Sequence, residues 1–163
     1  MAVQEQEPFV TARIDIAVPA QTVWRVLTEF SRYAEWHPVM SLGGPVPELV
    51  PGGLLAFRLS GGIAGEQAFT AELTRVAPAR LLAWQGGIRD VFFGWHSFEL
   101  HPLPGGGTRF TDTERWSGSM AVSVISGHRA ALEAEYARTV AALKQQAERG
   151  PRAGRTAAAQ GGA

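Results

Sequence analysis

The chain has 163 residues, of which 45% are hydrophobic and 18% charged, and its formal net charge is zero. This length fits one domain with a sizeable core, and the balanced charge gives no electrostatic footprint for nucleic acid. The absence of cysteine excludes disulfides, thiolate metal sites and a cysteine nucleophile.

The two ends of the chain differ in composition from its middle. Residues 1–7 are acidic and lack an apolar stretch, so they are not typical of a secretory signal. No apolar run approaches the ~20 residues that span a bilayer. We expect a cytoplasmic protein, a monomer or homodimer, without stable membrane insertion. A single domain is predicted over 9–148, between a flexible N-terminus at 1–8 and a disordered tail at 149–163.

The first half of the chain alternates strand and helix signals. Period-2 alternation predicts a strand over 9–17, and Pro19 then marks a helix start at which its missing N–H is harmless. Val23, Trp24 and Leu27 follow at helical spacing. The elements expected next are a short helix at 32–35, a strand at 39–43, a Pro/Gly-rich loop at 44–53 and a strand at 54–60.

The second half reads as strands followed by one long helix. The expected strands cover 66–76, 81–85, 92–101 and 108–116, the last two joined across the glycines at 105–107. The helix is predicted over 121–148, because apolar residues recur every three or four positions: Ile125, Leu132, Tyr136, Val140 and Leu143. The segment 86–93 is either a lid or merely a long connection, and the loop at 44–53 is an equally good candidate for a mobile entrance.

Several short stretches carry a family resemblance when taken in order. They are Pro19-Ala20 then Val23-Trp24; Tyr33 then Glu35-Trp36-His37-Pro38; Gly94-Trp95-His96 then Phe98-Glu99-Leu100; and Gly107-Thr108-Arg109-Phe110 then Glu114. They resemble the SRPBCC superfamily, the START-like and polyketide cyclase/dehydratase group. The resemblance implies an α+β helix-grip fold: a curved antiparallel sheet of six to seven strands with two short N-terminal helices, wrapped around a long C-terminal helix. His37 departs from it, because many relatives carry Asn there.

A cavity inside such a fold would be lined by aromatic side chains with a few polar groups, as small-molecule pockets are. Period 2 puts His96 and Phe98 on one face of their strand and Trp95 on the other. The candidate ligand-binding residues are Trp36, Met40, Phe57, Phe69, Trp84, Phe93, His96, Phe98, Glu114, Trp116, Ile125, His128 and Leu132. The alternative is that most of them simply fill the core.

His96 is the candidate catalytic residue, with Glu114 or Asp112 as its carboxylate partner. A His–carboxylate pair can act as a general base near neutral pH, and His128 on the helix is also expected within reach. The alternative is a structural histidine bonded to a carboxylate. His37 and His101, each beside a proline, are expected at the surface. No motif indicates a metal site or a flavin or nicotinamide cofactor.

Three functions remain open at this stage. The first is a carrier that binds a hydrophobic small molecule such as a lipid, polyketide or isoprenoid. The second is a cofactor-independent cyclase, aromatase or dehydratase that uses His96 with Glu114 or Asp112. The third is an interaction module similar to the chaperone-activating members of the superfamily, suggested by Trp95 on the outer face.

Overall fold

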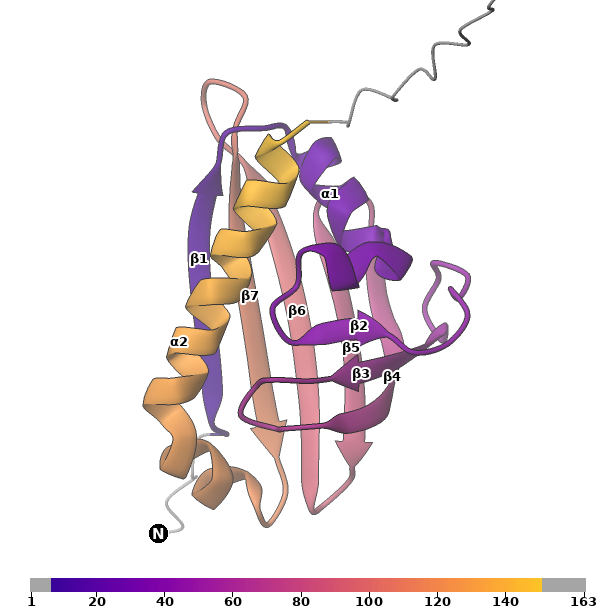
Figure 1. The fold of residues 1–163 in the computed structure, drawn as a ribbon, viewed down its shortest axis with the longest axis vertical. Coiled ribbons are helices and arrows are strands. Elements are labelled where there is room, and N and C mark those ends of the chain that lie inside the picture. The colour runs from indigo at the N-terminus through magenta and orange to yellow at the C-terminus, as the bar shows by residue number, and fades with distance from the viewer. Residues whose placement is uncertain (1–6, 151–163) are drawn as a thin grey trace, which may run out of the picture.

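A computed structural model describes residues 7–150 and shows seven strands, two α-helices and one short 3-10 helix (Figure 1). In chain order these are β1 (Phe9–Ile16), α1 (Ala20–Thr28), η1 (Phe30–Glu35), β2 (Met40–Leu42), β3 (Leu54–Leu59), β4 (Gln67–Ala77), β5 (Leu81–Ile88), β6 (Phe92–Pro102), β7 (Thr108–Ser117) and α2 (Ala121–Glu148).

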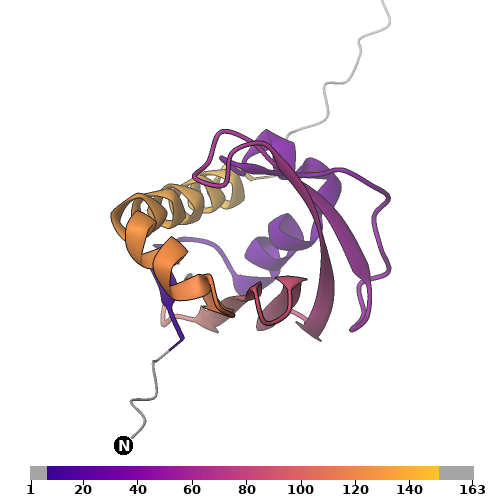
Figure 2. The same ribbon diagram turned by 90° about the horizontal axis from the view of Figure 1, so that it is seen from below.

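The strands form one antiparallel sheet in the order β1-β7-β6-β5-β4-β3-β2. The N-terminal strand therefore pairs with the last strand, and a shift of register in β4 between Leu73 and Arg75 interrupts the regular ladder. Seen from below, the sheet curls around an interior, and α2 lies along its open side (Figure 2). This arrangement confirms the predicted α+β helix-grip fold.

The long helix lies on β1 and β7 with the predicted apolar residues facing inward. Ile125, Leu132, Tyr136, Val140 and Leu143 are all buried. Polar contacts fix the C-terminal end of the helix: Lys144 Nζ donates to the Asp15 carbonyl at 2.8 Å, and Glu148 accepts the Ala17 amide at 2.8 Å. The helix is thus held by apolar burial along its length and by hydrogen bonds to β1 at its end.

The interior contains two apolar clusters that meet beneath α2. The larger cluster joins α1 and η1 to the sheet and includes Tyr33, Phe57 and Trp84. The smaller one joins α2 to β1 and β7 through residues such as Trp116 and Ile125. Burial of apolar area of this kind contributes roughly 25 cal/mol per Å² and is the main source of stability.

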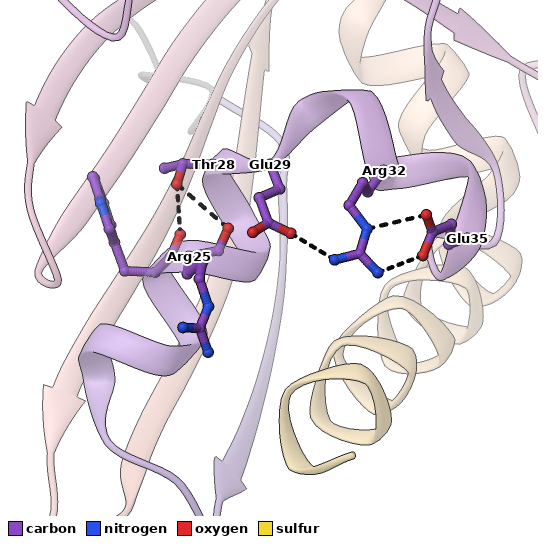
Figure 3. A network of polar contacts seen from close by, with 6 residues as sticks. Arg25, Thr28, Glu29, Arg32 and Glu35 are labelled. Atoms are coloured by element: carbon purple, nitrogen blue, oxygen red, sulfur yellow. Dashed lines mark hydrogen bonds and ion pairs between the residues drawn. The ribbon is translucent and has the colours of Figure 1, made fainter. Parts of the chain in front are cut away.

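The corner between α1 and η1 is braced by a network of polar contacts (Figure 3). The guanidinium of Arg32 donates to both carboxylate oxygens of Glu35, at 3.0 and 2.7 Å, and to Glu29 at 3.0 Å. Thr28 Oγ1 donates back to the Trp24 carbonyl at 2.9 Å. The two-point Arg32–Glu35 contact lies within η1, and the Arg32–Glu29 contact ties η1 to the residue before it. These groups are exposed, so each ion pair contributes little energy.

The segment 86–93 is neither a lid nor a long connection. Strand β5 continues to Ile88 and β6 already begins at Phe92, so the two strands are joined by a tight turn. The Val91 amide donates to the Ile88 carbonyl at 3.2 Å, and Asp90 takes a positive φ of 63°, which Asp tolerates better than most residues. The glycines at 86–87 are typical of loops in a sequence, and only the pairing of β5 with β6 shows that they lie in a strand.

The predicted flexible ends fall largely outside the described residues. Of the N-terminal segment only Glu7 and Pro8 are described, and the Pro8 carbonyl accepts the Trp116 amide at 3.0 Å. Of the tail only Arg149 and Gly150 are described. Within residues 7–150, neither α-helix combines the length and the apolar character that a membrane crossing requires.

Two glycines, one before and one after the start of α2, differ in whether the fold requires a glycine. Gly118 has a φ of 107°, and a Cβ there would lie 2.5 Å from the Val91 backbone, whereas a Cβ at Gly127 meets nothing within 4 Å. We expect Gly118→Ala to lower the free energy of unfolding by about 1–3 kcal/mol or more. Gly127→Ala should raise it by about 0.5–1 kcal/mol. Urea unfolding measures both changes in the free energy of unfolding. Equal effects would mean that the backbone at Gly118 does not require a glycine.

Candidate functional site

Four polar side chains meet in the interior between the two apolar clusters. The β6–β7 register places His96 opposite Glu114 and Phe98 opposite Asp112, so the three polar groups share the inner face of the sheet. His96 Nε2 donates to Asp112 Oδ1 at 2.6 Å, and Nδ1 lies 3.5 Å from Glu114 Oε2. The hydroxyl of Tyr136, from α2, donates to that same Glu114 oxygen. The groups form a line: Asp112, His96, Glu114, Tyr136.

Aromatic rings enclose the imidazole of His96. Its ring centroid lies 5.0 Å from that of Trp84, 4.7 Å from that of Phe98 and 5.8 Å from that of Tyr136. Trp84 and Phe98 belong to the larger apolar cluster and Tyr136 to the smaller one. The imidazole therefore bridges the two clusters in an environment of low dielectric, where electrostatic interactions are strong.

The pKa values in the cluster follow from burial and from neighbouring charges. Burial alone lowers the pKa of His96, but the charges of Asp112 and Glu114 and the hydrogen bond to Asp112 outweigh it, so the net shift is upward. Burial raises the pKa of Glu114 against the opposing effects of His96 and Tyr136. Burial also holds the pKa of Tyr136 well above its usual value, which keeps its hydroxyl protonated as a donor.

Glu114 is the member of the cluster that reaches solvent. Its side chain is 22% exposed, against 7% for His96 and 1% for Asp112. Gly94 makes room for it, because a Cβ at that position would lie 2.8 Å from Glu114 Oε1. Asp112 orients the imidazole through Nε2, and His96 faces Glu114 through Nδ1. This arrangement can deliver a proton to, or take one from, a molecule that contacts Glu114.

The structure brings most of the predicted wall residues to the inner side of the sheet. Met40, Phe57, Trp84 and Phe98 are buried in the larger cluster, with Trp36 and Phe69 packed against it. Trp116, Ile125 and Leu132 are buried in the smaller cluster. Their role as ligand contacts remains a prediction, since residues that only fill a hydrophobic core would pack in the same way.

Three expectations about individual residues are wrong. Phe93 lies with Trp95 on the outer face, their rings 5.0 Å apart, because period 2 separates both from His96. His128 is exposed and bonds the Val124 carbonyl of its own helix turn at 2.9 Å, so it does not reach His96. His37 is half-buried rather than at the surface, and its ring stacks on Tyr33 at 5.7 Å. The expectation for His101 holds, since its side chain is 63% exposed.

Sequence reasoning assigned Tyr136 only to the apolar stripe of the helix and missed its polar role. A tyrosine within an apolar stripe brings a hydroxyl that must find a partner when it is buried. That need, together with the carboxylate of Glu114 on the facing strand, could have predicted the hydrogen bond between Tyr136 and Glu114. Gly94 was missed because the space it provides is visible only once Glu114 is placed.

Two hollows on the protein lie away from this cluster. One, of about 450 Å³, is lined by α1, η1 and the C-terminal end of α2, and includes Arg25, Arg32 and Arg149. The other, of about 590 Å³, lies on the outer face of β1, β7 and β6. Among residues 7–150, no group of three or more His, Asp or Glu side chains is arranged to hold a metal ion.

Comparison with known proteins identifies the class to which this fold and site belong. Residues 8–148 match the family described as polyketide cyclase / dehydrase and lipid transport, so the chain belongs to that family. The match covers the whole sheet, both short helices and α2, and it confirms the resemblance to the SRPBCC superfamily.

Solved structures with the same fold are distant in sequence. The ZhuI aromatase/cyclase from a Streptomyces species is 16% identical, with a TM-score of 0.69 over 88% of this chain and 95% of that one. A hypothetical protein from Helicobacter pylori is 16% identical, with a TM-score of 0.70 over 88% and 90%. A protein from Thermus thermophilus is 10% identical, with a TM-score of 0.67 over 87% and 98%. No curated protein matches the chain.

Removal of the imidazole should leave the buried carboxylate of Asp112 and the partly buried carboxylate of Glu114 without their shared partner. We expect His96→Phe to lower the free energy of unfolding by about 3–5 kcal/mol near pH 6. Because the folded pKa of His96 is raised, its stabilising contribution is complete below the unfolded value of about 6.5 and declines as pH rises through the folded value. The difference between wild type and variant should therefore narrow by pH 9.

The matched control is His101→Phe on the same strand, which should change stability by less than about 0.5 kcal/mol because the side chain is exposed. Urea unfolding at the two pH values measures both variants. A His96→Phe protein as stable as the control at pH 6 would mean that the carboxylates do not depend on the imidazole.

Proposed function

We propose that the chain binds a hydrophobic small molecule, such as a polyketide, lipid or isoprenoid chain, inside the grip of the sheet and α2. The observation that carries this proposal is the polar line from Asp112 through His96 and Glu114 to Tyr136, set among the aromatic rings of the interior. Apolar walls with a few convergent polar groups and shifted pKa values are the features of small-molecule sites.

A purely structural role explains this cluster poorly. Buried ion pairs are often no more stabilising than well-packed apolar residues of the same volume, because desolvation offsets their attraction. The family to which the chain belongs, and its structural likeness to an aromatase/cyclase, both support a role in binding. Recognition of an oxygen-bearing molecule, or reaction with it, accounts for the cluster better than stability does.

Access to Glu114 would pass the segment 60–66, between β3 and β4. Its Ile63 amide donates to Glu135 Oε2 of α2 at 3.0 Å, and the Ile63 side chain packs on the smaller apolar cluster. The charge of Glu135 also reaches the site, since it contributes to raising the pKa of Glu114. We expect this segment, rather than 44–53 or 86–93, to move aside when a ligand enters.

Native mass spectrometry with three probes tests binding: a long-chain fatty acid, a linear isoprenoid alcohol and a polyphenolic anthraquinone. We expect an adduct of one molecule per chain with at least one probe, because apolar area removed from water stabilises the complex by roughly 25 cal/mol per Å² before entropic costs. No stoichiometric adduct with any probe would contradict the proposal.

Tryptophan fluorescence then locates the bound probe. Trp84 lies inside and Trp95 outside the sheet, so Trp84→Phe should remove most of the quenching caused by the probe and Trp95→Phe should not. Loss of quenching in Trp95→Phe but not in Trp84→Phe would place the probe on the outer face and contradict the interior site.

The proton line favours a second candidate function, cofactor-independent acid–base catalysis of the cyclase or dehydratase type. In this proposal Glu114 takes a proton from the carbon next to a carbonyl, and the C–H electron pair forms an enolate. His96 and Asp112 stabilise the protonation state of Glu114, and Tyr136 holds its carboxyl in place. The same proton can then return to carbon, or to a leaving oxygen in a dehydration.

Deuterium exchange at the α-carbon of 4-phenyl-2-butanone in heavy water tests this chemistry. The wild type should accelerate exchange roughly a hundred- to ten-thousandfold over buffer, and Glu114→Gln should remove the acceleration. Glu99→Gln, on the outer face of β6, is the matched control and should keep it. Exchange that survives Glu114→Gln would exclude Glu114 as the base.

No specific observation favours the third function, an interaction module. Trp95, which suggested it, is half-buried and packs edge-on against Phe93, whose ring also carries the Arg89 guanidinium at 4.4 Å. Its apolar surface is thus partly covered by its own neighbours.

A further inference from the structure

The segment that follows η1 carries two nitrogen donors without a protein acceptor among residues 7–150, of which the Trp36 Nε1 donor is buried. Trp36 Nε1 is buried and has no hydrogen-bond acceptor among the described residues. A buried N–H left unpaired in this way is unfavourable, because it has lost its hydrogen bond to water, so native proteins keep few of them. The Tyr33 ring lies edge-on to the indole at 5.0 Å, and a π face is at best a weak acceptor.

The neighbouring His37 has its tautomer fixed by the backbone. Its Nδ1 accepts the amides of Val39 at 3.3 Å and Met40 at 3.1 Å, so Nδ1 carries no hydrogen and Nε2 must carry it. Nε2 has no acceptor within residues 7–150, and because it is not a fully buried atom it is open to solvent or to a ligand. Burial and the charge of His96 lower the pKa of His37 to about 3, so the ring stays a neutral donor at physiological pH.

One array of rings connects these two donors to the His96 cluster. His37 stacks on Tyr33 at 5.7 Å, and Tyr33 on Phe57 at 6.0 Å. Phe57 contacts Trp84 at 5.3 Å, and Trp84 contacts His96 at 5.0 Å. An apolar molecule that contacts this array could therefore meet the two donors and the His96 cluster through different atoms.

We propose that Trp36 Nε1–H and His37 Nε2–H form a donor subsite that binds a carbonyl, enol or phenol oxygen of the ligand, remote from the group that meets Glu114. This inference rests on the interior binding site proposed above and narrows its ligand to apolar molecules with an acceptor oxygen. Backbone hydrogen bonds hold the segment that carries the two rings, because the amides of Trp36 and His37 both donate to the Tyr33 carbonyl, at 3.1 and 2.8 Å. Their ring centroids are 5.2 Å apart, so both belong to one small region of the wall.

Two probes of nearly identical shape test the subsite: 9-fluorenone, which carries a ketone oxygen, and fluorene, which does not. The wild-type chain should bind fluorenone more tightly than fluorene. Trp36→Phe should weaken fluorenone binding roughly three- to tenfold and leave fluorene unchanged, as expected for the loss of one hydrogen bond. Trp95→Phe is the matched control and should alter neither.

A second readout uses the wild type alone. In a ¹⁵N spectrum, the Trp36 indole N–H, assigned by its through-space contacts to Tyr33, should move downfield with fluorenone and not with fluorene. Equal binding of both probes, with no such shift, would overturn the donor subsite and leave the interior site standing. Failure of both probes to bind would contradict the interior site itself and the subsite with it.

Discussion

The contact of His96 with the buried carboxylate of Asp112 and the partly buried carboxylate of Glu114 is the interaction on which the interior of this protein depends. It joins β6 to β7 through Asp112 and Glu114 and reaches α2 through Tyr136. Each carboxylate would be costly in an aromatic interior without the imidazole between them, and the raised pKa of His96 reflects that dependence. The same arrangement leaves Glu114 exposed enough to meet a second molecule.

Two sets of polar groups border the aromatic interior. In one set, acids and an imidazole are coupled through hydrogen bonds and shifted pKa values, as proton-transfer sites are. In the other set, Trp36 and His37 offer neutral donors only. Aromatic rings of Tyr33, Phe57 and Trp84 connect the two. This polarity suits a molecule that has an apolar body and different functional groups at its ends.

Sequence patterns were sufficient for the elements and for the pairing of inner-face residues, because period 2 and period 3.6 are local properties of the chain. The long helix and its stripe from Ile125 to Leu143 were predicted on that ground and are confirmed. The same parity rule, applied strictly, would have put Phe93 beside Trp95 on the outer face. The segment 86–93 was not predicted as strand for another reason: its strand character depends on the pairing of β5 with β6, which local sequence patterns do not show.

The sequence by itself determined the fold class, the family resemblance and the shared face of His96, Asp112 and Glu114. Only the tertiary structure decided which groups touch, because contacts between β7 and α2 depend on how the helix is placed on the sheet. It chose Tyr136 over His128 as the partner from α2 and made Glu114 the accessible acid. It also turned His37 inward, because two backbone amides needed an acceptor at Nδ1.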